Sequence, residues 1–533
     1  MQIVIPMSGT GQRFLDAGYT DPKPLIVVDG KPMIAHVVDL FPGENNFIFI
    51  CNHEHLEHTP MGELLRQVAP ACSIVGIPPH KKGPVFAVTQ ALDLLNDNEE
   101  IIVNYCDFAK YWDYEGFLAH TRERRADGAV TAYRGFHPHM LGMSSYAFMR
   151  EEQQWMLEIK EKESFTNDRI AEYASDGTYY FRKGSFLKAY FRELLAKGIA
   201  VGGEYYVSLV YNLLLRDGLK VSIFEIEHML QWGTPRDLEE YIGWSNYFRT
   251  ARGRQEEQPL RCKGVNLIPL AGRGQRFVAA GYDRPKPLID VMGEPMIIRA
   301  ARSLPYAPRN IFVCLGEHLD NYPLDDAIRL YFNEAKIVRV NTFTEGQACT
   351  CEVGLDGEDP NASLLIGACD NVMVWDRSAY DELLADETVE AIVWSFRRHS
   401  SSERNPSMYG WLAVNDKNEI EYASVKRQIS DDPYNDHAIA GAFYFRKTSY
   451  FTEALQQLYR NNIRINNEFY VDSIINELIA VGRKVKVFQV DNYVCWGTPQ
   501  DLRTYQYWQR FFSNCAWHPY ESVDETFGRH PLL

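Results

Sequence analysis

Short apolar runs alternate with longer helix-like stretches along the chain. Residues 3–7, 46–51 and 99–106 (IVIPM, NFIFIC and EEIIVNYC) have the length of β-strands, and residues 87–95 (AVTQALDLL) follow a helical pattern. The apolar runs are nearly continuous, which is typical of strands that are buried on both faces of a sheet. The pattern predicts an α/β fold in which helices cover both faces of a mixed, mainly parallel sheet. In such a fold the ligand lies at the carboxyl ends of the strands.

The whole pattern occurs twice. Gly9 and Gly272 lie 263 residues apart, whereas Gly177 and Gly441 lie 264 apart, so the second copy holds one inserted residue. A register that holds over a whole copy indicates two complete domains rather than a solenoid of short repeats. The length of 533 residues agrees with this, because one hydrophobic core seldom organises so long a chain.

The repeat sets the expected domain limits. We expect the first domain to span residues 1–250 and the second to span residues 263–513. The polar segment 251–262 separates them as a linker, and residues 514–533 form a C-terminal tail.

A further strand and helix follow in the later part of each copy. The strand-like segments GTYYFRKGSF (177–186) and AGAFYFRKTSY (440–450) precede the helical segments 206–218 and 470–482. These segments predict an added strand and helix layer beside the first half of each domain.

Charge and composition restrict the partners. The formal charge is −16 at pH 7, and both nucleic acids and anionic membranes attract proteins with an excess of Lys and Arg. No apolar run approaches the roughly 20 residues that cross a bilayer, and the N-terminus carries no basic and apolar leader. We therefore expect no nucleic-acid partner, no membrane insertion and a cytoplasmic location.

The ten cysteines are scattered through the chain. Only Cys349 and Cys351 lie close together, and their spacing matches no zinc-finger pattern. We expect free thiols, which are typical of a reducing compartment.

A glycine-rich loop follows the first strand of each copy. SGTGQRFLDAGYTDPKPL (residues 8–25) and AGRGQRFVAAGYDRPKPL (residues 271–288) nearly repeat each other. Glycines in such a loop allow a tight turn and let backbone N–H groups approach an anion, and basic side chains add charge beside it. The residues expected to bind phosphate in this way are Gly9, Gly11, Arg13 and Lys23, with Gly272, Gly274, Arg276 and Lys286. A tight turn without a ligand explains the same glycines, and neither a dinucleotide fingerprint nor a P-loop fits the spacing.

Several motifs carry a resemblance to a known family. GxGxRF, AGY and PKPL, together with WGTPRDL (232–238) and WGTPQDL (496–502), resemble those of the sugar-1-phosphate nucleotidyltransferases, or pyrophosphorylases. The resemblance extends over both copies and points to the capsule and lipopolysaccharide branch. It implies two tandem Rossmann-like α/β/α domains of the GT-A-like type. It also implies in-line attack of a sugar phosphate on the α-phosphorus of an NTP, release of pyrophosphate, and Mg²⁺ as the neutralising cation.

An aspartate ends a buried strand in each copy. Asp107 follows IIVNYC and Asp370 follows LLIGAC, at the edge of the sheet where the ligand is expected. Carboxylate oxygens suit a hard cation such as Mg²⁺, and the resemblance makes these residues the first metal ligands. An aspartate that only begins a turn is the alternative at each position taken alone.

The second metal ligand departs from the family pattern. Relatives carry a carboxylate two residues before the glycine of the late GT motif, where this chain has Gln231 and Cys495. Glu227 and Asp491 lie four residues earlier and correspond to each other, so we assign them as candidate metal ligands. Exposed surface carboxylates are the alternative.

The resemblance also assigns an acceptor site. In KEKES it makes Glu161 the residue that bonds sugar hydroxyls and Lys162 the one that meets the phosphate, whereas the second copy has Val425 and Lys426. The second copy therefore keeps the phosphate contact and recognises the rest of its acceptor differently. A solvated Glu-Lys pair is the alternative. Further acceptor contacts implied by the resemblance are Gly177, Glu204, Gly441 and Glu468.

The resemblance places the base against HKKGPVFA in the first copy and TEGQACTC in the second, where Gly83 and Gly346 correspond. Gln347 can bond a base edge in two directions, whereas Pro84 at the same position offers neither a side-chain nor a backbone donor. The two copies are therefore expected to bind different ligands.

These motifs predict an enzyme that joins an NTP to a sugar-1-phosphate or a small phosphorylated alcohol, as a step towards surface polysaccharide. In its sharper form the protein is bifunctional. One catalytic copy beside a degenerate copy that senses nucleotide or stabilises the protein is an alternative, and a non-catalytic nucleotide-sugar binding protein is another. A GT-A glycosyltransferase fits less well, since neither CDF nor CDN completes an Asp-x-Asp motif. Association into a homo-oligomer stays open.

Overall fold

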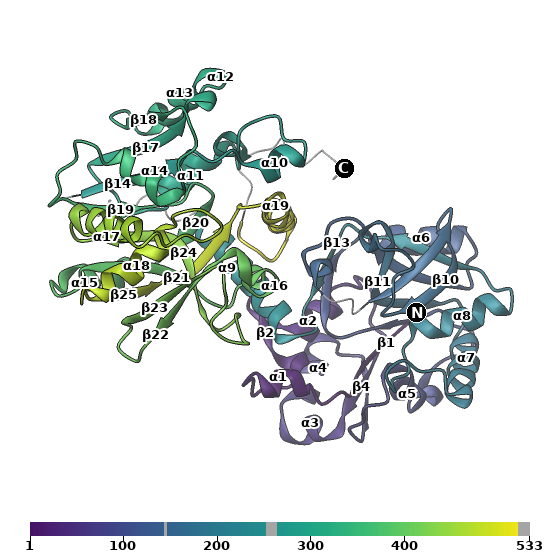
Figure 1. Ribbon diagram of the computed structural model, residues 1–533. Helices are drawn as coiled ribbons and strands as arrows, with labels where there is room; N and C mark the ends of the chain where they lie inside the picture. The colour runs from purple at the N-terminus through teal and green to yellow at the C-terminus, as the bar shows by residue number, and fades with distance from the viewer. Residues whose placement is uncertain (143–145, 252–263, 521–533) are drawn as a thin grey trace. The chain divides into compact units, whose positions relative to one another are not determined.

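The computed structural model describes residues 1–142, 146–251 and 264–520. These residues form two compact units, each built around its own sheet, and the division along the chain falls between Ser245 and Asn246 (Figure 1). The predicted linker 251–262 except Ala251, and most of the predicted tail 514–533, lie outside the described residues, and the predicted domain limits stay predictions.

The first unit contains a nine-stranded mixed sheet with the order β5-β4-β1-β6-β11-β8-β12-β10-β9. β1 pairs in parallel with β4 and β6, whereas β11 runs antiparallel to β6 and β8. The expected α/β class is therefore confirmed, and antiparallel pairing is confined to β11 and the edge formed by β10 and β9. The strands are β1 (Gln2–Met7), β2 (Val27–Val28), β3 (Lys31–Pro32), β4 (Phe47–Asn52), β5 (Ser73–Ile77), β6 (Ile101–Asn104), β7 (Phe108–Tyr111), β8 (Gly128–Tyr133), β9 (Ala147–Glu152), β10 (Trp155–Glu161), β11 (Tyr173–Phe181), β12 (Val221–Glu225) and β13 (His228–Gln231).

Two layers of helices bury the two faces of this sheet. Successive residues of β1 point to opposite faces, so that Val4 joins one hydrophobic cluster while Ile3 and Ile5 join the other. α5, α7 and α8 pack on the first face, and α2, α4 and α6 pack on the second. The helices are α1 (Gln12–Asp16), α2 (Met33–Val38), α3 (His53–His58), α4 (Met61–Val68), α5 (Pro84–Thr89), α6 (Tyr114–Glu123), α7 (Gly184–Lys197), α8 (Ser208–Arg216) and α9 (Pro235–Ala251).

The second unit has the same order of strands, β18-β17-β14-β19-β24-β21-β25, and β22 joins it by pairing with β24 and β23. Its strands are β14 (Gly264–Leu270), β15 (Asp290–Val291), β16 (Glu294–Pro295), β17 (Arg309–Leu315), β18 (Lys336–Val340), β19 (Ser363–Ile366), β20 (Asn371–Val374), β21 (Ala391–Phe396), β22 (Gly410–Val414), β23 (Ile420–Val425), β24 (His437–Phe445), β25 (Val485–Gln489) and β26 (Asn492–Cys495). Its helices are α10 (Gln275–Ala279), α11 (Met296–Arg302), α12 (Gly316–Asn321), α13 (Leu324–Tyr331), α14 (Gln347–Gly354), α15 (Arg377–Ala385), α16 (Ser400–Arg404), α17 (Thr448–Arg460), α18 (Val471–Ala480) and α19 (Pro499–Asn514).

Two expectations about composition can be compared with this structure. Within the described ranges, no helix is long and apolar enough to span a bilayer. The described cysteines, Cys349 and Cys351 among them, are all free thiols, which confirms that part of the sequence analysis.

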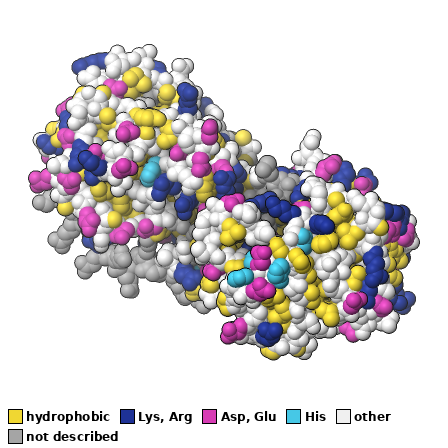
Figure 2. All heavy atoms as spheres, turned by 90° about the horizontal axis from the view of Figure 1, so that it is seen from below, with side chains coloured by type: hydrophobic (Ala, Val, Ile, Leu, Met, Phe, Trp, Pro, Cys, Tyr) yellow, Lys and Arg dark blue, Asp and Glu magenta, His cyan; other side chains and the backbone are white. Residues whose placement is uncertain are grey.

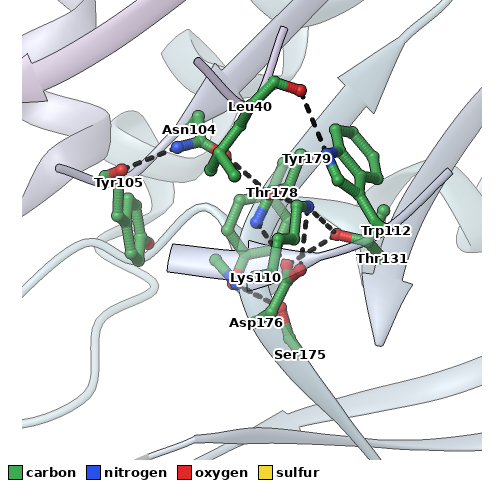
Figure 3. A network of polar contacts seen from close by, with 11 residues as sticks. Leu40, Asn104, Tyr105, Lys110, Trp112, Thr131, Ser175, Asp176, Thr178 and Tyr179 are labelled. Atoms are coloured by element: carbon green, nitrogen blue, oxygen red, sulfur yellow. Dashed lines mark hydrogen bonds and ion pairs between the residues drawn. The ribbon is translucent and has the colours of Figure 1, made fainter. Parts of the chain in front are cut away.

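A buried polar network joins β7 to the inner strands β8 and β11 of the first unit (Figure 3). The Lys110 ammonium on β7 bonds Asp176 Oδ2 at 2.9 Å, Thr178 Oγ1 at 2.7 Å and Thr131 Oγ1 at 3.1 Å. The side chains of Lys110 and Asp176 are both 0% exposed, and the ammonium lies 3.5 Å from the Trp112 ring centroid. Burial lowers the pKa of Lys110 to about 8, with Asp176 opposing that shift.

The second unit fills the corresponding space with apolar side chains. Met373, Trp394, Ala440 and Ala442 stand where the first unit has Lys110, Thr131, Asp176 and Thr178. All four are buried, so the same backbone tolerates either a satisfied polar network or an apolar filling.

This difference yields a test of what the network contributes. We expect Asp176→Ala to lower the free energy of unfolding of the first unit by about 3–5 kcal/mol, because it leaves Lys110 buried without its carboxylate. Copying the second unit with Lys110→Met, Thr131→Trp, Asp176→Ala and Thr178→Ala together is expected to cost less than the single change. Urea unfolding of the full chain measures both, and a quadruple variant less stable than Asp176→Ala would contradict the argument.

Candidate functional site

The glycine-rich loop joins the end of β1 to α1 in the first unit, and its counterpart joins β14 to α10. Gly11 and Gly274 have φ values of 67° and 63°, a left-handed conformation that glycine adopts without strain. Gly9 and Gly272 lack a positive φ, and a Cβ at either position would meet nothing within 4 Å. The fold therefore requires the second glycine of each loop, whereas the first one faces open space.

A lysine and an aspartate join three distant segments at this loop. Lys23 Nζ lies 2.6 Å from Asp107 Oδ2 and 2.8 Å from the carbonyl oxygen of Gly233. The backbone N–H of Trp232 in turn donates to the carbonyl of Asp107 at 3.1 Å. The PKPL motif, the end of β6 and the WGTP motif thus meet at one point.

The second unit repeats this arrangement. Lys286 bonds the Asp370 carboxylate and lies 3.1 Å from the carbonyl oxygen of Gly497. Burial works against the charged form of Lys286, but Asp370 outweighs it and raises the pKa of this lysine.

The strand register separates the predicted second metal ligands from the first ones. β13 runs antiparallel to β7, with Gln231 opposite Phe108 and therefore next to Asp107. Glu227 lies beyond the other end of β13, four residues away, which corresponds to roughly 13 Å along a strand. β26 and β20 pair in the same way, so Asp491 is equally remote from Asp370. The pairing of Glu227 and Asp491 with the strand-end aspartates is thus wrong.

Other carboxylates lie closer to the strand-end aspartates than the sequence indicated. Thr498 caps α19, with its hydroxyl and its backbone N–H both bonded to Asp501 in a capping box. A Cβ built on Gly497 would lie 3.6 Å from Asp370 Oδ2 and 3.8 Å from Asp501 Oδ2. Burial raises the pKa of Asp501, and it raises that of Asp237 in the first unit to about 6. The T-P-x-D spacing is the sequence signal that could have identified these residues.

The predicted acceptor residues of the first unit lie together. Glu161 accepts a hydrogen bond from Ser208 Oγ at 2.5 Å, and burial raises the pKa of its carboxyl group. Lys162 Nζ lies 2.5 Å from the hydroxyl of Tyr206, which also bonds Glu204. Burial and Glu204 raise the pKa of Tyr206 while Arg13 opposes the shift, so the loop arginine acts on this cluster.

The lysine of the acceptor site has an unusual backbone conformation in both units. Lys162 and Lys426 have φ values of 61° and 60°, which non-glycine residues rarely adopt outside turns and functional sites. Lys426 Nζ bonds the carbonyl of Met408, and burial lowers its pKa. Asp472, Glu468 and Asp370 raise that pKa whereas Arg276 lowers it further, so charges of the loop, the strand end and the acceptor segment all act on this ammonium group.

The glycines assigned to base recognition have a steric role. The carbonyl of Lys82 accepts from Tyr205 N–H at 3.0 Å, and Val85 N–H donates to the Tyr205 carbonyl at 3.1 Å. Gly83 lies between these bonds with φ 82°, and a Cβ on it would lie 2.7 Å from Tyr205 N. In the second unit a Cβ on Gly346 would lie 2.5 Å from the backbone N of Phe469. Each glycine therefore lets the base segment cross the acceptor segment at backbone contact distance.

The remaining predicted residues are two glycines of the acceptor side and Gln347 of the base side. Gly177 and Gly441, on β11 and β24, have φ values of 102° and 86°, and the Tyr105 N–H donates to the Gly177 carbonyl at 3.1 Å. Gln347 is the first residue of α14, at the position that Pro84 takes in α5.

A pocket of about 270 Å³ opens beside the first-unit loop. Gly11 and Lys23 line it from the loop side, and Glu54, His55 and His58 line it from α3. On the face of the molecule shown in Figure 2, several histidine side chains gather among acidic ones. Burial lowers the pKa of His55, and among the described residues no group of three or more His, Cys, Asp or Glu side chains could hold a metal ion.

Comparison with known proteins identifies a domain in the first unit. Residues 3–171 match the family model of the MobA-like NTP transferase domain. The chain is 24% identical to the bifunctional protein GlmU of Campylobacter fetus over 226 residues, which cover 42% of this chain and 48% of that protein. It is 23% identical to GlmU of Staphylococcus epidermidis over 248 residues, which cover 45% of this chain and 49% of that protein. The chain thus spans about half the length of the curated relatives it matches.

Solved structures resemble a similar share of the chain. A nucleoside-diphosphate-sugar pyrophosphorylase from Vibrio cholerae has a TM-score of 0.38 at 22% identity, covering 45% of this chain and 99% of its own. An inositol-1-phosphate CTP transferase from T. maritima has a TM-score of 0.38 at 16% identity, covering 46% of this chain and 95% of its own.

The steric role of the crossing glycines can be tested directly. We expect Gly83→Ala and Gly346→Ala each to lower the free energy of unfolding by about 1–3 kcal/mol, because the new Cβ meets backbone and the φ is unfavourable for alanine. Gly9→Ala is the matched control, since its Cβ enters open space and its φ needs no glycine. Thermal and urea unfolding measure the effect, and equal stabilities for Gly83→Ala and Gly9→Ala would refute the assignment.

Proposed function

We propose that this protein is a nucleotidyltransferase that joins the nucleotidyl group of an NTP to a sugar-1-phosphate or similar phosphorylated acceptor and releases pyrophosphate. The observation that carries the proposal is the contact that joins three motifs in each unit: Lys23 bonds Asp107 and the Gly233 carbonyl, and Lys286 bonds Asp370 and the Gly497 carbonyl. The family match of residues 3–171 supports the same chemistry for the first unit.

Mg²⁺ suits the strand-end aspartates. Each carboxylate is partly exposed and, among the contacts described, bonds a lysine ammonium. Carboxylate oxygen is a ligand that this hard cation prefers. Mg²⁺ often binds through one or two carboxylates together with substrate phosphates, so one aspartate per unit is sufficient. We propose that Asp107 and Asp370 hold the ion, which would neutralise charge on the triphosphate when bound.

The remaining residues position the two substrates. In our proposal the open loop at Gly9 and Gly272 admits the triphosphate, and Arg13 and Arg276 neutralise it. Lys162 and Lys426 bind the acceptor phosphate, for which their fixed backbone conformation prepares them. Phosphoryl chemistry of this kind depends mostly on positioning and charge neutralisation, so no further acid or base is required.

We propose that both units are active and that they differ in substrate. Each unit keeps the Lys-Asp pair and the left-handed lysine, which supports two working sites. The base segments differ in charge, with Lys81 and Lys82 in one and Thr344 and Glu345 in the other. The motif resemblance to the capsule and lipopolysaccharide branch supports surface polysaccharide as the destination of the products.

Substitution of the strand-end aspartates tests the proposal. Pyrophosphate release is measured with the four common NTPs and a panel of sugar and polyol phosphates, using Asp107→Asn, Asp370→Asn and the parent chain. Loss of a metal-binding carboxylate is expected to lower kcat/KM of its own unit by about 10³-fold or more. Each variant should abolish one set of substrates and leave the other.

Two exposed aspartates serve as matched controls. Asp93→Asn in the first unit and Asp416→Asn in the second remove a charge at the surface, and both activities should persist. Absence of turnover with every substrate pair would refute the enzyme, and loss of all activity through only one strand-end aspartate would refute two active units.

A further inference from the structure

The acceptor strand and the helix beside it dock in the same register in both units. In the first unit, the Asn212 side chain bonds the N–H of Ile159 at 3.1 Å and its carbonyl at 2.8 Å. In the second unit, Asn476 bonds the N–H and the carbonyl of Ala423, both at 2.8 Å. Because these bonds fix α8 on β10 and α18 on β23 identically, positions on the two pairs of elements can be compared one by one.

In this comparison Asp472 of the second unit corresponds to Ser208 of the first unit. In the first unit, Ser208 at the start of α8 donates to Glu161 at the end of β10. In the second unit, Val425 ends β23 and Asp472 occupies the first turn of α18. The second unit therefore has no carboxylate at this position of the strand and has one on the facing helix instead.

A third position changes with these two. Glu161 pairs across the sheet with Ala147, and Val425 pairs in the same way with Gly410. A Cβ built on Gly410 would overlap Asp472 Oδ2. The glycine therefore makes the space that the carboxylate of Asp472 occupies, whereas the smaller Ser208 tolerates an alanine there.

Asp472 lies in the charge environment of the second acceptor site. Lys426, the phosphate-binding lysine of our proposal, is the charged group that acts on it most, and Asp472 in turn raises the pKa of Lys426. Arg276 of the loop, Glu468 of the acceptor segment and Asp370 at the strand end also act on the charge of this lysine. Burial raises the pKa of Asp472 to about 6.

We propose that Asp472 is the residue of the second site that recognises the hydroxyl groups of the acceptor, in the place that Glu161 has in the first. The inference rests on the proposed function and makes it more specific. The carboxylate approaches from α18 instead of β23, so it meets a hydroxyl at a different position on a phosphorylated sugar or polyol. The two sites thus select different members of one substrate class.

Turnover measurements on the full chain test this assignment. The probes are α-D-glucose 1-phosphate, α-D-mannose 1-phosphate and sn-glycerol 3-phosphate, each with the four common NTPs, and the activity that Asp370→Asn removes belongs to the second unit. Asp472→Asn is expected to raise the acceptor KM of that activity about 10- to 100-fold, because a hydrogen bond to a charged group is lost. The NTP KM and the first-unit activity should change less than about twofold, and Asp416→Asn is the matched control.

A triple exchange separates recognition from a structural role. Gly410→Ala, Val425→Glu and Asp472→Ser together place the first-unit residues at these three positions, and the acceptor preference of the second site should move towards that of the first unit. Ile439 Cδ1 must shift in this variant, because it would lie 2.8 Å from the new Cβ at position 410. Calorimetric binding of the same three phosphates to the parent and to Asp472→Asn provides a readout that does not require catalysis.

The outcomes distinguish the two proposals. Weaker acceptor binding in Asp472→Asn without turnover in any protein would refute the proposed function and keep this inference. Second-unit turnover that responds to Asp370→Asn but not to Asp472→Asn would overturn the inference alone. Absence of both turnover and binding for all probes would overturn both.

Discussion

The contact between a lysine and a strand-end aspartate is the constraint on which each unit depends. Lys23 and Asp107 come from segments 84 residues apart, and the same lysine bonds the carbonyl of Gly233, 210 residues away. A carboxylate at the end of a buried strand would repel the phosphates of a ligand, and the ammonium group balances its charge at the place where the loop opens. The pair is only partly exposed, so solvent screens it less than a surface ion pair. The loop, the strand end and the WGTP turn are thereby kept in one geometry.

Apart from this shared contact, the two units differ from each other in groups of neighbouring side chains. The buried network of Lys110, Asp176 and two threonines has an uncharged counterpart of Met, Trp and two Ala side chains in the second unit, and no half-replaced set occurs. This agrees with the energetics of buried charge, since removal of one partner costs more than removal of both. The acceptor sites also differ as a group. Where the first unit has Glu161, Ser208 and Ala147, the second unit has Val425, Asp472 and Gly410.

The sequence predicts local and repeated features well and long-range packing poorly. The apolar runs identify the sheet strands, and the doubled PKPL and strand-end aspartates identify residues that the structure brings into contact. The assignment of Glu227 failed because proximity along the chain was taken for proximity in space, whereas β13 runs away from Asp107. The crossing of the base and acceptor segments at Gly83 joins residues that are remote in sequence, so no local pattern reveals it. The role of Asp472 is not visible in the sequence for the same reason, since this residue and Val425 lie on a helix and a strand that are close only in the folded structure.

The two acceptor arrangements exclude each other physically. In the first unit, the Ser208 hydroxyl lies 2.5 Å from Glu161, so an aspartate at the serine position would bring two buried carboxylates together. Like charges at that distance in a poorly solvated place cannot both stay ionised, and one would bind a proton. In the second unit, an alanine at Gly410 would overlap the Asp472 carboxylate. At these facing positions the packing therefore allows one carboxylate, either on the strand or on the helix, and the choice between them sets where the acceptor must present its hydroxyl.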